Sequence, residues 1–130
     1  MDKQKILEYL DESGMSDIEV IKEEKEYMAV KFFYDFDEDE MKAAEAYAND
    51  ESGKEKNDSW NEEFYLPYLT ELSVDNVGEI IEEIMGDTGT KAQFVSYQME
   101  EGDDYSEFIA VFNDEGAVVN IEDILDKLEG

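Results

Sequence analysis

The chain has no cysteine, no histidine and no arginine, and only one of its 130 residues is proline. Without histidine and cysteine it lacks the commonest zinc ligands and the usual bases and nucleophiles of catalytic triads. Without arginine it lacks the planar group that binds phosphates and carboxylates through two hydrogen bonds. The chemistry that remains is that of carboxylates, hydroxyls, amides and lysine.

Long hydrophobic runs are also absent. No segment approaches the roughly 20 apolar residues that a membrane-spanning helix needs. The first residues, Met1 to Lys5, lack the apolar stretch of a signal peptide. The absence of cysteine fits a reducing compartment. We therefore expect a cytoplasmic protein that does not bind membranes.

Negative charge dominates what is present: 38 Asp and Glu residues against 10 lysines, for a formal net charge of −28 at pH 7. This charge repels nucleic-acid backbones, so direct nucleic-acid binding is not expected, and it speeds encounters with basic proteins. Many chains of this charge are disordered. Here, however, 42% of the residues are hydrophobic and they recur in periodic blocks. The pattern predicts one folded domain over residues 1–130.

The spacing of apolar residues and turn signals predicts the secondary structure of the first half. The expected elements are a helix over about 3–13 capped by Asp2, a hairpin whose stronger strand covers 27–36, and a helix that begins at Asp37. A polar linker at about 49–59 follows.

The second half is expected to begin with a helix from Ser59 that ends or kinks at Pro67. The elements expected after it are a helix capped by Ser73 or Asp75, strands at about 91–100 and 105–113, and a last helix capped by Asn120.

Together these elements predict an α+β fold with a four-stranded antiparallel sheet, made from two hairpins, and helices packed mainly on one face. The order helix, hairpin, helix occurs over 3–50 and again over 75–129, an αββα pseudo-repeat. The alternative stays open that this order recurs only because antiparallel hairpins backed by helices are a common arrangement. The strand at 27–36 is apolar on both faces, so we expect helices, a second subunit or a partner to cover both faces of the sheet.

The acidic run Asp35 to Glu40 resembles the start of a calcium-binding loop. Counting from Asp35, the sixth position is Glu40 instead of glycine, and the twelfth is Ala46 instead of glutamate. The run is better explained as a strand end followed by a helix, in which Asp37 and Glu40 form a capping pair. No metal and no cofactor is predicted.

Glu79, Glu82 and Glu83 are candidates, together with the acids at 8, 12, 38, 40 and 45, for a carboxylate site that holds Mg²⁺ in a hydrolase. These three glutamates lie off the apolar stripe of their helix, as a solvated face requires. No nucleophile elbow, phosphate-binding loop or dinucleotide fingerprint occurs. We therefore expect a protein that is not an enzyme, with a carboxylate-based Mg²⁺-dependent hydrolase as an alternative.

An aromatic cluster surrounds Pro67 directly after the linker. It consists of Trp60, Phe64, Tyr65 and Tyr68. These rings are either core residues or a partly exposed hydrophobic anchor within a charged rim, the arrangement that concentrates binding energy at interfaces.

Charge and aromatic residues together predict a surface that binds a basic protein partner, as in an inhibitor, an immunity protein or a DNA mimic. The residues expected to supply the charge are Asp37, Glu38, Asp39, Glu40, Glu101, Asp103 and Asp104, with Trp60 and Tyr65 as anchors. A simpler explanation is that the charge serves solubility.

The order of the elements, the length and the low isoelectric point resemble the small acidic secretion chaperones. The resemblance implies a homodimer that binds extended client segments. No residue motif accompanies it, and the extra helices between the hairpins depart from the usual order of those chaperones. A small acidic chaperone or adaptor is thus a second functional hypothesis.

Overall fold

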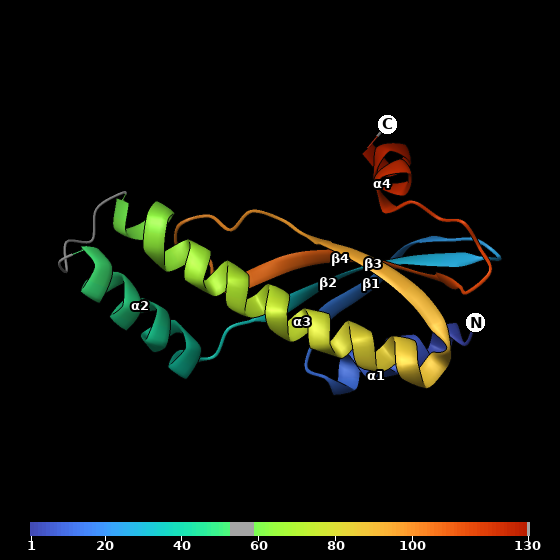
Figure 1. Ribbon diagram of the computed structural model, residues 1–130, viewed down its shortest axis with the longest axis horizontal. Coiled ribbons are helices and arrows are strands. Elements are labelled where there is room, and N and C mark those ends of the chain that lie inside the picture. The colour runs from blue at the N-terminus through green and yellow to red at the C-terminus, as the bar shows by residue number, and fades with distance from the viewer. Residues whose placement is uncertain (53–58, 130) are drawn as a thin grey trace.

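A computed structural model describes residues 1–52 and 59–129, which form a four-stranded antiparallel sheet with helices on both faces (Figure 1). The first half contains α1 (Lys3–Glu12), β1 (Ser16–Glu23), β2 (Tyr27–Asp35) and α2 (Glu38–Ser52). The second half contains η1 (Trp60–Tyr65), α3 (Leu66–Thr88), β3 (Thr90–Ser96), β4 (Tyr105–Asp114) and α4 (Ile121–Glu129). The predicted α+β class and the sheet of two hairpins are confirmed.

The strand order is β1-β2-β4-β3, and all neighbours are antiparallel. The two hairpins therefore meet through their second strands, while the first strand of each lies at an edge. β2 and β4 pair in unbroken register from Tyr27 opposite Asn113 to Asp35 opposite Tyr105. This central pairing joins the two halves of the chain into one sheet.

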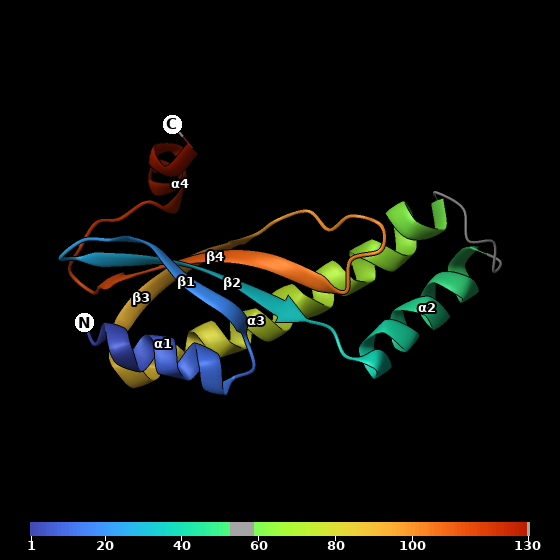
Figure 2. The same cartoon turned by 180° about the vertical axis from the view of Figure 1, so that it is seen from behind.

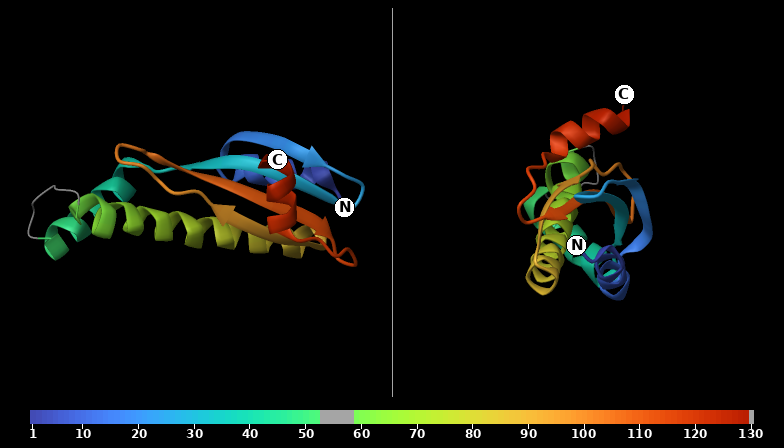
Figure 3. Two further views of the ribbon diagram at one scale, coloured as in Figure 1. Left: turned by 90° about the horizontal axis from the view of Figure 1, so that it is seen from above. Right: turned by 90° about the vertical axis from the view of Figure 1, so that its right-hand side faces the viewer.

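The main core lies between the sheet and two helices, α1 and α3, which run side by side beneath it (Figure 3). Its buried side chains from the strands are Met28, Val30, Phe32, Phe108, Ala110 and Phe112. At its centre the rings of Phe32 and Phe108 stack with centroids 5.7 Å apart. Burying a large apolar side chain stabilises a fold by about 1.5–3 kcal/mol, so each of the larger side chains in this core contributes on that order.

The opposite face of the sheet is covered by α4 at one end, as Figure 3 shows. Ala29 and Val111 are buried there against Ile121 and Ile124. The side chain of Gln93 holds the start of α4, because its amide donates to the carbonyl of Val119 at 2.7 Å and its oxygen accepts from the Ile121 N–H at 3.2 Å. The expectation that helices lie mainly on one face is thus confirmed, with α4 as the exception.

Two of the predicted helix caps, Asp2 and Asn120, are confirmed. The carboxylate of Asp2 accepts from the Lys5 N–H at 3.0 Å, and the side-chain amide oxygen of Asn120 accepts from the Glu122 N–H at 2.8 Å. These caps depend only on neighbouring residues, since each satisfies a backbone donor in the first turn of its own helix.

The helix expected from Ser59 is the π-helix η1, which ends at Tyr65, and α3 continues directly from it with Pro67 in its first turn. The predicted change at Pro67 is therefore a switch from π-helix to α-helix beside that residue.

The prediction of a new helix cap after Pro67 is wrong. Ser73 does not cap a helix, because α3 runs unbroken from Leu66 to Thr88. Ser73 is buried within it, and its hydroxyl donates to the Thr70 carbonyl at 2.9 Å. Asp75 is an exposed residue inside the same helix.

The predicted linker at 49–59 starts too early, because α2 continues to Ser52, and residues 53–58 lie outside the described residues. Beyond the end of the sheet, α2 packs beside η1 and the start of α3 (Figure 2). The two αββα halves therefore differ, since α4 covers the sheet and α2 does not. That they arose by duplication stays a prediction.

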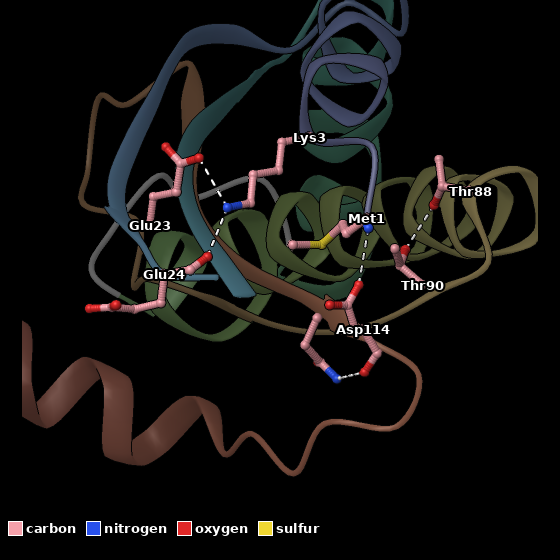
Figure 4. Close-up of polar contacts among 8 residues, drawn as sticks. Met1, Lys3, Glu23, Glu24, Thr88, Thr90 and Asp114 are labelled. Atoms are coloured by element: carbon pink, nitrogen blue, oxygen red, sulfur yellow. Dashed lines mark hydrogen bonds and ion pairs between the residues drawn. The ribbon is translucent and has the colours of Figure 1, made fainter. Parts of the chain in front are cut away.

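Polar contacts tie the N-terminal segment to the ends of the strands (Figure 4). The Lys3 ammonium lies 3.0 Å from the carboxylate of Glu23 and donates to the backbone carbonyl of Glu24 at 2.7 Å. The N-terminal ammonium of Met1 lies 3.2 Å from the carboxylate of Asp114. These contacts fix α1 beneath both hairpins.

Candidate functional site

The two acidic segments singled out from the sequence meet at one end of the sheet. The backbone N–H of Phe36 donates to the carbonyl oxygen of Asp104 at 2.9 Å, which joins the end of β2 to the start of β4. The acidic first turn of α2 and the acidic loop between β3 and β4 therefore lie near each other. The exposed members of the predicted set at this end are Asp37, Glu38, Asp39, Glu101 and Asp104.

Several of these carboxylates already have partners within the chain. Asp37 and Glu40 cap α2 reciprocally: the Glu40 N–H donates to the Asp37 carboxylate at 2.7 Å, and the Asp37 N–H donates to the Glu40 carboxylate at 3.0 Å. Glu38 forms an ion pair with Lys42 at 3.0 Å, and Asp103 accepts from the Glu100 N–H at 2.9 Å. Asp39, Glu101 and Asp104 are the predicted acids whose carboxylates have no such contact among the described residues.

Glu40 also takes part in a half-buried polar cluster. The Tyr34 hydroxyl donates to its carboxylate at 2.6 Å, and the side-chain amide of Asn76 donates to the Tyr34 oxygen at 2.8 Å. Burial, followed by the hydrogen bond to Glu40, raises the pKa of Tyr34 to about 12, because both disfavour the phenolate. Glu40 thus positions α2, and it is less free to bind a partner than the sequence suggested.

Of the two alternatives that the sequence allowed for Trp60, core residue or exposed anchor, the exposed anchor is wrong. Its side chain is only 5% exposed, and its indole N–H donates to the side-chain oxygen of Asn49 at 3.0 Å. Its ring stacks on that of Tyr65, with centroids 4.7 Å apart. Tyr65 is half-buried and packs in the cluster around Phe36 and Leu69. The alternative prediction, that these rings are core residues, is confirmed for Trp60.

Sequence reasoning missed an open groove between the first turns of α3 and the loop that joins β3 to β4 (residues 97–104). It has a volume of about 680 Å³. Its lining residues are Glu62, Leu66, Pro67, Thr70, Glu71, Val74, Gln98 and Met99. Figure 1 shows this orange loop passing beside η1 and the start of α3. We call this feature the α3 groove.

The apolar part of the α3 groove comes from one stripe of the helix. Leu66, Thr70 and Val74 follow one another at a spacing of four, so they share a face. That stripe is half-buried and lies beside the fully buried stripe that contains Leu69 and Val77. The spacing of these residues was visible in the sequence. The groove itself forms only in the folded protein, where the β3–β4 loop places the buried Met99 along its other side.

Carboxylates surround this apolar floor. Glu62 and Glu71 line the α3 groove, and both are exposed. A smaller hollow of about 220 Å³ continues from it along the loop and adds Glu100 and Glu101. Among the residues that the structure describes, 1–52 and 59–129, no lysine lines either hollow. Acids around a low-dielectric floor concentrate a negative potential there, which favours a positively charged ligand.

In residues 1–52 and 59–129 no group of three or more Asp and Glu residues is placed to hold a metal ion. Within the same residues, no helix has both the length and the apolar character needed to cross a bilayer. The candidate site is therefore the α3 groove together with the acids of the adjoining loop.

No protein-family model, no curated protein and no solved structure matches this chain. Function is therefore inferred from the chemistry and the geometry of its own residues.

Proposed function

We propose that the protein is a non-enzymatic binding module, acting in the cytoplasm, that holds a basic segment of another protein in the α3 groove. The observation that carries the proposal is the composition of the groove: an apolar floor that includes Leu66 and Val74, within a rim that includes Glu62 and Glu71. A segment that fits it has apolar side chains on one side and lysine or arginine at its margins.

Each part of the groove has a distinct role in binding. The apolar floor supplies affinity, because covering it removes apolar surface from water. The rim of glutamates supplies selectivity, because complementary charges at a rim set the association rate and reject acidic competitors. The net charge of −28 extends the attraction beyond the groove.

The same net charge bears on which partner is expected. Two copies of a chain with charge −28 repel each other, so a different, basic protein is a better occupant than a second copy. A groove of about 680 Å³ holds a short segment and not a whole domain. An inhibitor of a basic protein and an adaptor for a basic client segment both use such a groove. A DNA mimic needs acids in phosphate-like rows, so it depends less on the α3 groove than an inhibitor or an adaptor does.

The experiment is a selection from a library of random peptides displayed on phage, with the full chain as bait. We expect the selected peptides to be enriched both in lysine or arginine and in apolar residues. Their affinity is then measured for the double variant Glu62→Gln/Glu71→Gln. The matched control is Glu79→Gln/Glu82→Gln, which makes the same charge change at exposed positions of α3 outside the groove.

We expect the groove variant to bind the selected peptides about 2- to 30-fold more weakly, since each of its two rim charges contributes roughly 0.2–1 kcal/mol. The control should lose much less. Thr70→Trp, which fills the groove without changing its charge, should also weaken binding. Peptides without basic residues, or equal losses in the groove variant and the control, would show that the groove is not the binding site.

A further inference from the structure

The face of the sheet that carries α4 is only partly covered. Beyond the end of α4, alternate residues of β2 and β4 point away from the main core. They are Lys31, Phe33 and Asp35 of β2 and Tyr105 and Glu107 of β4. Asp35 pairs with Tyr105 and Phe33 with Glu107, so charged and aromatic side chains are neighbours across the two strands.

Two aromatic rings and two carboxylates on this face enclose a pocket. The rings of Phe33 and Tyr105 meet edge to face with centroids 5.5 Å apart, and Tyr105 is 40% exposed. Together with Asp17 and Asp35 they line a hollow of about 260 Å³. Asp17 reaches it from β1, where the pairing with β2 is irregular between Ser16 and Glu19.

On the same face, a lysine side chain of the protein already contacts one of these rings. The Lys31 ammonium lies 5.5 Å from the centroid of the Phe33 ring and 3.2 Å from the carboxylate of Glu107. This is the combination of a π face and a carboxylate that attracts organic cations. Lys31 does not line the pocket, whose open volume lies between Phe33, Tyr105 and the two aspartates.

The aspartates of the pocket carry charge that the rest of the described chain does not neutralise. Within residues 1–52 and 59–129, neither the Asp17 nor the Asp35 carboxylate has a hydrogen bond or an ion pair. Both residues are exposed. A ligand that complements this pocket carries positive charge beside the carboxylates and can contact the face of an aromatic ring.

We infer that the pocket formed by Asp17, Phe33, Asp35 and Tyr105 binds the guanidinium group of an arginine side chain on a partner protein. A guanidinium is planar and weakly hydrated, stacks on aromatic rings and donates several hydrogen bonds to carboxylates. The pocket consists of residues that do not line the α3 groove. The inference therefore does not depend on the function proposed for that groove.

The test is a titration of the isotope-labelled full chain with arginine amide, followed by NMR at the signals of Phe33 and Tyr105. Citrulline amide, in which a neutral urea replaces the guanidinium, is the matched ligand. Arginine amide should produce saturable shifts at these two residues, and citrulline amide should not. Equal shifts with both ligands, or arginine shifts spread evenly over the acidic surface, would overturn the inference.

Variants separate this pocket from general charge attraction. Asp17→Asn/Asp35→Asn removes its two charges. Asparagine tolerates the left-handed backbone at position 17 (φ 47°), so the fold should be kept. The control is Asp11→Asn/Asp126→Asn, the same change at exposed positions of α1 and α4. Tyr105→Leu removes one ring.

We expect Tyr105→Leu to bind arginine amide about 2- to 5-fold more weakly, the effect of losing one exposed cation–π contact. The pocket variant, which loses two charges, should bind it about 2- to 30-fold more weakly. The control should change little. If the control loses as much as the pocket variant, the binding is non-specific and the inference fails. The α3 groove is tested by Glu62→Gln/Glu71→Gln, which leaves this pocket intact, so the two proposals succeed or fail separately.

Discussion

The hydroxyl of Tyr34 donates a 2.6 Å hydrogen bond to Glu40, the residue that caps α2 together with Asp37. Through Asn76 the same hydroxyl also contacts α3. One side chain at the end of β2 therefore joins the sheet to two helices. The helix α2 needs this connection, because its fully buried residues are only two alanines, Ala44 and Ala48, which bury little apolar surface.

Replacing Tyr34 by phenylalanine should lower the free energy of unfolding by about 1–3 kcal/mol, because Glu40 and Asn76 lose their partner inside a half-buried cluster. Urea denaturation measures the change. Tyr105→Phe is the matched control, since Tyr105 is exposed and its hydroxyl has no hydrogen bond within the described residues. An equal effect of both substitutions would contradict the role of the Tyr34 hydroxyl.

The raised pKa of Tyr34 predicts a dependence of stability on alkaline pH. The group has a pKa of about 12 in the folded protein and about 10 in an unfolded chain. Its contribution is therefore fully present below about pH 10 and is lost as the pH rises through about 12. The difference in urea midpoint between the wild type and Tyr34→Phe should shrink over this range. A constant difference would show that Tyr34 does not titrate in this way.

The capping contacts could be predicted from the sequence, because Asp2, Asp37, Glu40 and Asn120 interact with backbone groups only two or three residues away. The continuity of α3 could not. Ser73 has the local character of a cap, but position 73 falls on the stripe that α3 buries, four residues after Leu69 and four before Val77.

The candidate site was predictable only in part. The sequence identified the acids of the β3–β4 loop, but it did not identify the α3 groove, which forms because Met99 of that loop packs in one cluster with Leu66 and lines the groove together with Val74. Contacts between residues this far apart leave no periodic signal. Trp60 was ambiguous for the same reason, since its burial depends on the position of α2 and on Asn49.

The side chain of Gln93 should control how firmly α4 is held on the sheet. In Gln93→Leu the two hydrogen bonds to the start of α4 are lost, and we expect faster amide exchange in α4 with little change in β2 and β4. Gln98→Leu serves as the control, because it makes the same substitution at an exposed position away from α4. Unchanged exchange in α4 would mean that the apolar contacts of Ile121 and Ile124 alone hold this helix on the sheet.

Trp60, the only tryptophan, should report on the contact between α2 and η1 by fluorescence. Its burial predicts blue-shifted emission and weak quenching by acrylamide in the native protein. Asn49→Ala removes the acceptor of the indole N–H and should cost about 0.5–1.5 kcal/mol and shift the emission to the red. Asp50→Ala, at the exposed neighbouring position, should leave the emission unchanged. Native emission typical of water-exposed tryptophan would contradict the placement of Trp60.

The strand order β1-β2-β4-β3 affects the growing chain on the ribosome. The first hairpin is complete once β2 has been made, but one edge of β2 stays unpaired until β4 emerges, after α2, η1, α3 and β3. An unpaired edge can pair with the same edge of another nascent chain, which is a route to aggregation. The dense negative charge opposes such encounters. The charge that we assign to partner recognition would thus also keep neighbouring chains on a polysome apart until each sheet has closed.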